Sequence, residues 1–248
     1  MIAYHGGPIW PERAALTVWR NRHAMMSFAT PEQLPTAAAI AESFALDNGA
    51  YSNWKAGKPA DWEGYYAWIE QWHRHPGFDF AVIPDVVDGN EAENDSLVFT
   101  QWPFNRSIGV PVWHLHESLN RLEVLLGEFP RVALGSSGEW ANPGTQRWWA
   151  RMAAAMETAC NSQGRPKAKL HGLRMLNPTI VRHLPLASAD STTVAHGIII
   201  DKRWTGSYQP TNKETRALVV ANMLEPIRPA TEWKAMHIQD QLLEMYAE

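Results

Sequence analysis

The 248-residue sequence predicts an α/β fold, a (β/α)8 TIM barrel that forms a single domain over residues 1–248 and ends in C-terminal helices. Three observations predict it. Eight short apolar segments alternate with helix-like segments, and eight is the strand number of this barrel. The length and the hydrophobic fraction of 45% suit one sizeable core. Polar or acidic residues follow most apolar segments, as they do where barrel strands deliver side chains to one rim.

The eight apolar segments are the expected strands. They are residues 2–4, 24–28, 44–46, 80–83, 110–115, 132–134, 168–173 and 187–189. No internal repeat or linker divides the chain. We therefore expect one continuous barrel.

Helix-start signals lie between the apolar segments. Pro11 and Pro31, each followed by Glu, open the first two helices, while Asp61 and Ser118 are expected N-caps of later ones. After the eighth strand, two more helices are expected over residues 212–224 and 231–246.

Cysteine and hydropathy limit the class of protein. Cys160 is the single cysteine, which excludes an internal disulfide and a Cys-based zinc cluster and fits a reducing cytosol. The chain has no apolar run of about 18 residues, and its first ten residues lack the regions of a signal peptide. We expect a cytoplasmic protein with no membrane partner, no cofactor and no bound metal.

Three acids follow predicted strands. Asp190 ends the run of small residues 187–189 and is followed by three hydroxyl residues. Asp47 follows the third strand in the sequence LDNGAY, and Asp85 follows the fourth in IPDVVDG. Asp88 is the weaker candidate in that last motif because it begins a turn. The carboxyl ends of all barrel strands meet at one rim, so these acids are expected to converge.

The fifth and sixth strands add other polar groups. His114 and His116 share one face of the fifth strand by period-2 alternation, which favours a polar pocket. The sixth strand ends in LGSSGE, where glycines beside serines expose backbone N–H groups around Gly135 and Ser136, with Glu139 as a further acceptor. This motif lacks the glycine spacing and the lysine of a phosphate-binding P-loop.

Positive charge gathers late in an otherwise acidic chain. Residues 161–216 hold nine Lys or Arg against three acids, although the whole chain has a net charge of −4. Within this stretch, Lys202, Arg203 and Trp204 combine cations with an aromatic ring, which suits phosphate contact and base stacking. An alternative is that Trp204 merely covers the barrel end.

The ordered motifs LDNGAY, IPDVVDG, PVWHLHE, LGSSGE, LHGLRML and ASADSTTVA resemble those of the guanine transglycosylases. The resemblance is to barrel enzymes related to tRNA-guanine transglycosylase, in particular the compact phage and bacterial branch that places 7-deazaguanines in DNA. It runs from about Phe44 to His196.

The resemblance implies a function and a role for each matching residue. Asp190 would attack the anomeric carbon of a guanosine and expel guanine, and Asp47 would be the general acid/base. Asp85 would accept hydrogen bonds from the base, the backbone at Gly135 and Ser136 would donate to its O6, and His114 or His116 would be a further contact. A 7-deazaguanine base, of the preQ0 type, would replace guanine in DNA. Elementary chemistry agrees, since glycosyl transfer needs one carboxylate at the sugar and a second group for the leaving group's proton.

The chain departs from the tRNA-acting pattern, and alternatives stay open. The structural zinc site of three cysteines and a histidine is absent, so DNA is the favoured partner and tRNA the alternative. Extraction of a base from a duplex favours a wedge, for which Trp54, Trp140 and Trp204 are candidates. Two other hypotheses are a metal-dependent barrel hydrolase that uses His5, His114, His116 and acids, and a binding protein without catalysis. The sequence does not indicate an oligomeric state.

Overall fold

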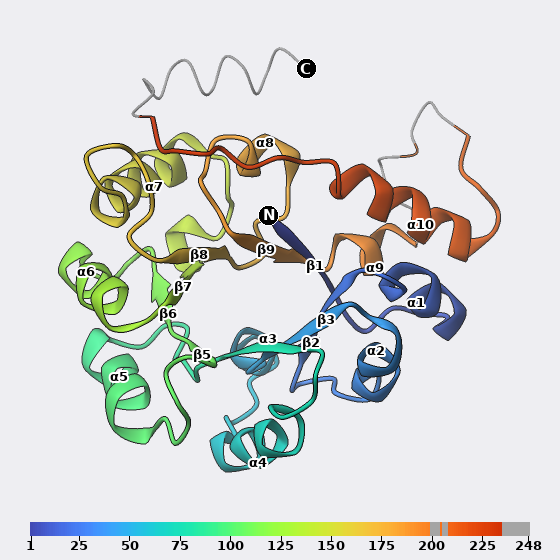
Figure 1. The fold of residues 1–248 in the computed structure, drawn as a ribbon, viewed down its shortest axis with the longest axis horizontal. Helices are drawn as coiled ribbons and strands as arrows, with labels where there is room; N and C mark the ends of the chain where they lie inside the picture. Colours follow the sequence, from blue (N-terminus) through green and yellow to red (C-terminus); the bar gives the residue numbers. More distant parts are fainter. Residues whose placement is uncertain (199–203, 205–207, 235–248) are drawn as a thin grey trace.

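The computed structural model describes residues 1–198, 204 and 208–234, and it forms a parallel barrel ringed by helices (Figure 1). The strands are β1 (Ile2–Gly6), β2 (His23–Ser27), β3 (Ser43–Asp47), β4 (Phe78–Val82), β5 (Gly109–Val110), β6 (Val112–His114), β7 (Arg131–Gly135), β8 (Lys169–Gly172) and β9 (Ser188–Ser191). All pair in parallel, in the order β5-β4-β3-β2-β1-β9-β8-β7-β6. The predicted barrel and its eight apolar segments are thus confirmed.

The fifth predicted strand is the one departure, because Pro111 divides it into β5 and β6. Proline has no backbone N–H and interrupts a sheet ladder. β5 pairs with β4, whereas β6 pairs with β7, and Pro111 O accepts a hydrogen bond from Ala133 N (2.9 Å). The two ends of the strand order are therefore neighbours in the chain, and nine short strands occupy eight barrel positions.

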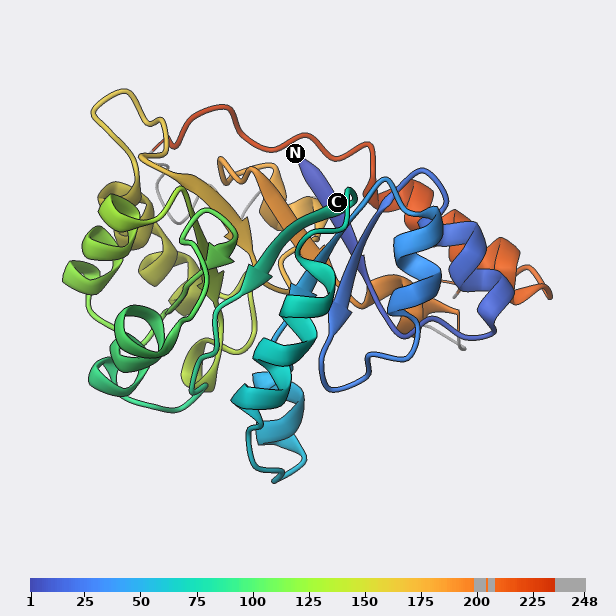
Figure 2. The ribbon, with the colours of Figure 1, turned by 60° about the horizontal axis from the view of Figure 1, so that its bottom comes forward.

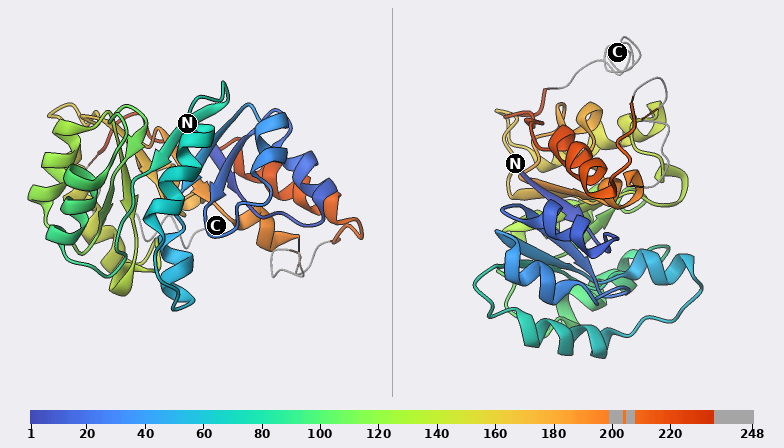
Figure 3. Two further views of the ribbon diagram at one scale, coloured as in Figure 1. Left: turned by 90° about the horizontal axis from the view of Figure 1, so that it is seen from below. Right: turned by 90° about the vertical axis from the view of Figure 1, so that its right-hand side faces the viewer.

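The longer helices cover the outside of the barrel, whereas α3 lies near its middle in the view of Figure 1 (Figures 1 and 3). They are α1 (Glu12–Trp19), α2 (Leu34–Ile40), α3 (Ala50–Lys55), α4 (Trp62–Trp72), α5 (Glu91–Asp95), the π-helix η1 (Ser96–Gln101), α6 (Leu119–Glu128), the 3-10 helix η2 (Gly138–Trp140), α7 (Gln146–Ala159), α8 (Pro178–Val181), α9 (Thr193–Gly197) and α10 (Lys213–Leu224). The expected caps are confirmed at Asp61, which accepts from Gly64 N, and at Ser118, which accepts from Arg121 N. The expected helix over residues 231–246 falls mostly outside the described residues.

Two layers of buried side chains hold the barrel together. The inner layer fills the barrel with residues from alternate strand positions, such as Tyr4, Met25, Phe80 and Val112. The outer layer lies between strands and helices and includes four fully buried tryptophans: Trp19, Trp113, Trp148 and Trp149. Much of the high tryptophan content therefore serves core packing.

The C-terminal part of the described chain closes the structure on itself. α10 packs against α1, and Glu225 forms an ion pair with Arg22 and a hydrogen bond with His5. The chain then runs back to the loop after α7, where Trp233 N donates to Gly164 O (2.7 Å). Gly164 has φ +74°, and a Cβ there would lie 2.3 Å from Trp233 O, so this contact requires glycine.

None of the described helices combines the length and apolar character needed to cross a bilayer.

Candidate active site

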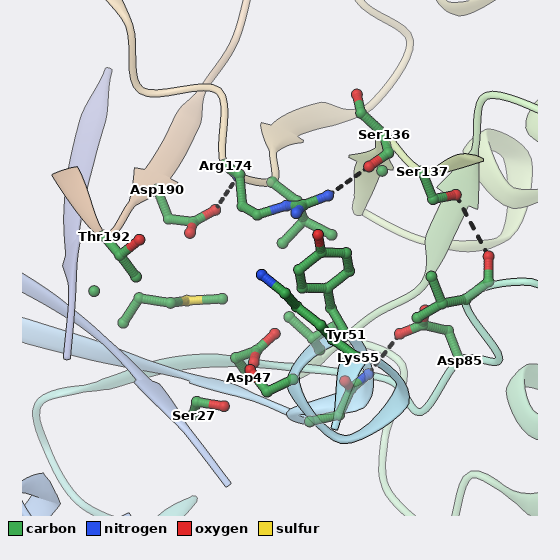
Figure 4. A pocket seen from close by; sticks show the side chains of 18 of the residues that line it. Ser27, Asp47, Tyr51, Lys55, Asp85, Ser136, Ser137, Arg174, Asp190 and Thr192 are labelled. Atoms are coloured by element: carbon green, nitrogen blue, oxygen red, sulfur yellow. Dashed lines mark hydrogen bonds between the residues drawn. The ribbon is translucent and has the colours of Figure 1, made fainter. Parts of the chain in front are cut away.

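A cavity of about 520 Å³ lies at the carboxyl ends of the strands (Figure 4). We call it the central cavity. Six of the predicted site residues line it: Asp47, Asp85, His114, Gly135, Ser136 and Asp190. They come from five different strand ends and are brought together only by closure of the barrel.

Asp190 lies in β9 and is 7% exposed. Its Oδ1 accepts a hydrogen bond from the backbone N–H of Arg174 (2.8 Å), and the ring Nε2 of buried His171 lies 3.4 Å from the same oxygen. Arg174 adopts φ +57°, an uncommon conformation that aims its N–H at the carboxylate. Within the described chain, Oδ2 has no hydrogen-bond partner, so one oxygen is fixed and the other remains available.

Asp47 ends β3 and faces Asp190 across the central cavity (Figure 4). Burial and then the charge of Asp190 are the largest causes that raise the pKa of Asp47 to about 6, against opposing hydrogen bonds from Ser27 and Gly49. Gly49 N lies 3.0 Å from Oδ2. The raised pKa leaves a protonated fraction of Asp47 near neutral pH, which suits proton transfer.

Asp85 is held by two donors and is 8% exposed. Asn48 Nδ2 donates to its Oδ1 (2.7 Å), and His114 Nε2 lies 2.9 Å from its Oδ2. Burial lowers the pKa of His114, but the hydrogen bond and charge of Asp85, with the charge of Glu117, outweigh it and raise that pKa overall. The pair therefore favours a charged imidazolium beside a carboxylate.

A buried polar network supports Asp85 and His114 from behind. Glu117, 2% exposed, accepts hydrogen bonds from His114 N (2.8 Å), Asn94 Nδ2 (2.8 Å) and Arg121 Nη1 (2.7 Å). Asn94 Oδ1 in turn accepts from Val86 N (2.7 Å), next to Asp85. The loop that carries Asp85 is fixed to the scaffold on this side.

The loop after β7 presents its backbone to the central cavity. Ser136 Oγ accepts from Trp148 Nε1 (2.9 Å), and Ser137 Oγ donates to Val87 O (3.4 Å), so both hydroxyls are bound to the scaffold. Among the described residues, no hydrogen bond uses the backbone N–H of Ser136 or Ser137. These N–H groups are available to a carbonyl oxygen, as the Gly-Ser sequence predicts.

Sequence reasoning did not identify several cavity residues. Arg174 stacks over the Tyr51 ring, with Cζ 3.8 Å from the centroid, and its guanidinium donates to Ser136 O (Figure 4). Lys55 and Asn48 also line the central cavity. The one signal in the sequence was spacing, because Tyr51 and Lys55 are four residues apart and lie one turn from each other on α3.

His116 and Glu139 lie outside the central cavity, although the sequence groups them with its residues. Both line a neighbouring cleft. His116 stacks on His114 at 5.4 Å between ring centroids, and Glu139 forms an exposed ion pair with Arg147. β6 ends at His114, so strand alternation no longer fixes the direction of His116. Their predicted contact with a base stays a prediction.

The predicted nucleic-acid segment is described only in part. Lys202 and Arg203 lie outside the described residues, and their role stays a prediction. Trp204 is half-buried and packs against the outer core, in line with a covering role at the barrel end.

The geometry does not favour the metal-hydrolase alternative. Along β1, Tyr4 fills the barrel and His5 therefore points outward, where its Nε2 lies 3.3 Å from Glu225 Oε1. His5 does not join His114 and His116. In the part of the chain that the structure describes, no group of three or more His, Cys, Asp or Glu is placed to hold a metal ion.

The central cavity thus combines a carboxylate with one available oxygen, an acid that titrates near pH 6, a carboxylate held by two donors and available backbone N–H groups. This set can form and break a glycosyl ester while one group moves a proton. Comparisons of the chain with protein-family models, curated proteins and solved structures give no significant match.

Proposed function

We propose that this protein is a guanine transglycosylase that exchanges guanine in DNA for a 7-deazaguanine base through a covalent glycosyl-Asp190 intermediate. The observation that carries the proposal is the placement of Asp47, Asp85 and Asp190 in one cavity, with the pKa of Asp47 raised to about 6 in part by Asp190. A cavity that holds a second carboxylate beside an acid of raised pKa can divide nucleophilic and proton-transfer roles between the two groups.

Asp190 is the proposed nucleophile. Its available oxygen attacks C1′ of the target guanosine, and the C1′–N9 bond breaks as the Asp190–C1′ ester bond forms. The hydrogen bond from Arg174 N to the other oxygen (2.8 Å) fixes the orientation of the carboxylate before the reaction.

Asp47 is the proposed acid and then base. In the first step its carboxyl proton passes to the departing guanine, which leaves as the neutral base. In the second step, Asp47 takes the N9 proton of the incoming 7-deazaguanine as that nitrogen attacks C1′ and releases the Asp190 carboxylate. A pKa of about 6 allows both forms to be populated near neutral pH.

Asp85 and the loop after β7 are the proposed base-recognition groups. Guanine and 7-deazaguanine present N1–H and an exocyclic amine beside O6, so a carboxylate next to backbone N–H groups is complementary. Each Asp85 oxygen already accepts one hydrogen bond, from Asn48 or His114, and retains capacity for a second. The Ser136 and Ser137 N–H groups then donate hydrogen bonds to O6 of the base, and the Tyr51 ring offers a surface on which the base can stack.

DNA is the proposed polymer because the motifs resemble the DNA-acting branch and the cysteines of the tRNA-acting zinc site are missing. Lys55 and Arg174, both exposed at the cavity, supply positive charge for the sugar-phosphate backbone of a bound strand.

The test is incorporation of radiolabelled guanine into acid-precipitable polymer. Double-stranded DNA, single-stranded DNA and bulk tRNA are compared with wild-type protein and Asp190→Asn. We expect label in DNA with the wild type alone. Label in tRNA and not in DNA would show that tRNA is the polymer on which the enzyme acts. No exchange of guanine or of a 7-deazaguanine base in any polymer would overturn the proposal.

A further inference from the structure

A smaller cleft of about 300 Å³ adjoins the central cavity, and we call it the side cleft. The two share Val87 and Ser137 as lining residues, and the Ser137 Oγ to Val87 O hydrogen bond (3.4 Å) ties this shared wall together. Its volume is at the lower end for small-molecule sites, about 300–1,000 Å³. A planar group bound there would be an immediate neighbour of one in the central cavity.

Two indole rings line the side cleft. Trp54, on α3, is 46% exposed, and Trp140, in η2, is half-buried beneath the Arg147 guanidinium, whose Cζ lies 5.3 Å from its ring centroid. Figure 2 shows α3 projecting from the barrel beyond the neighbouring loops. A large aromatic side chain left in solvent beside a cleft is typical of a surface that stacks on a ligand.

Aromatic contacts connect the side cleft to the central cavity by two routes. Tyr51 of the central cavity lies 5.8 Å from Trp54 between ring centroids. His114 of the central cavity stacks on His116 of the side cleft at 5.4 Å. Aromatic side chains thus link the walls of the two pockets.

The polar groups of the side cleft favour a ligand that donates hydrogen bonds. Asp88 and Glu139 line it with exposed carboxylates, which accept hydrogen bonds, and Glu139 is also paired with Arg147. A planar ring with an exocyclic amine satisfies both the indoles and the carboxylates, and adenine, cytosine and guanine carry such an amine. Thymine presents two carbonyl oxygens around a single N–H and fits less well.

We propose that the side cleft binds the base of the nucleotide next to the exchanged one, in the same DNA strand, and that it prefers an amine-bearing base to thymine. This inference rests on the proposed function. The two bases would be splayed apart, one into each pocket, with the Val87–Ser137 wall between them.

The test measures the affinity of single-stranded oligonucleotides for Asp190→Asn protein, which binds without turnover. The nucleotide on each side of a single guanosine is replaced in turn by an abasic residue. On one side we expect this loss to weaken binding about fivefold or more, the scale of one base stacked on an aromatic ring. In protein that also carries Trp54→Ala or Trp140→Ala, the same abasic residue should not change the affinity.

The second comparison uses protein that keeps both indoles. There, replacement of cytosine by thymine at that position should weaken binding.

Trp10→Ala is the matched control, because Trp10 is 59% exposed but lines neither pocket. It should retain the full abasic effect. One outcome is that the abasic residue weakens oligonucleotide binding equally with and without the two indoles while the wild type still exchanges bases. In that case the side cleft does not bind the neighbouring base, and the proposed function still stands. If no oligonucleotide binds and no polymer exchanges bases, both proposals fall.

Discussion

The charge of Asp190 acts on Asp47 and is, after burial, the largest cause that raises the pKa of Asp47 from the ordinary value of 3.8 to about 6. Two acids that face one cavity cannot both ionise without cost. The pair therefore costs the protein stability at neutral pH, and this cost is measurable.

Asp47→Asn is expected to stabilise the protein above pH 6. The folded state holds the Asp47 proton more tightly than the unfolded state, so the free energy of unfolding falls as pH rises from about 4 to about 6. Asparagine has no charge to bury, and the gain at pH 8 should be about 1–3 kcal/mol. Urea unfolding at pH 5 and pH 8 measures it. Asp88→Asn, at an exposed acid of the same rim, should leave the pH dependence unchanged; equal behaviour of the two variants would contradict the prediction.

Asp190→Asn is expected to reduce base exchange by about 10⁴-fold or more, since loss of a covalent nucleophile is among the largest single effects in enzymes. Asparagine still accepts the hydrogen bond from Arg174 N, so the free energy of unfolding should change by no more than about 1 kcal/mol. Exchange assays and thermal unfolding give the two results. Retained exchange would remove Asp190 as nucleophile, and loss of folding would assign it a structural role.

The strand positions were predictable from sequence because each buried strand is a short apolar run with a polar residue at its carboxyl end. Asp47, Asp85 and Asp190 were found by that same signal, and barrel closure alone brings them together. Tyr51 and Arg174 were not identified because α3 and the loop after β8 are positioned by tertiary contacts rather than by local periodicity. The neighbouring placement of His116 and Glu139 depends in the same way on where β6 and β7 end.

Asp85→Asn is expected to lower the pKa of His114 and to weaken base binding. The charge of Asp85 helps to raise that pKa against burial, and burial remains when the charge is removed. Guanine affinity should fall by about tenfold or more, because a hydrogen bond to a charged acceptor is lost. NMR titration of the His114 ring and equilibrium binding of guanine measure the two effects. An unchanged His114 titration together with unchanged affinity would place Asp85 outside the recognition site.

Glu117→Ala is expected to destabilise the protein by about 3–5 kcal/mol. Glu117 is buried and accepts three hydrogen bonds, and its removal leaves the Arg121 guanidinium, 2% exposed, without one of its two carboxylate partners. Glu70→Ala is the matched control, since it also breaks an i,i+4 carboxylate–arginine pair, but an exposed one, with Arg74 (2.8 Å). That variant should change stability by less than about 0.5 kcal/mol.

Because Asn94 joins Glu117 to the loop of Asp85, folded Glu117→Ala protein should also bind guanine more weakly, whereas Glu70→Ala should bind it as the wild type does. Equal destabilisation by the two variants would show that the network behind His114 contributes no more than a surface ion pair.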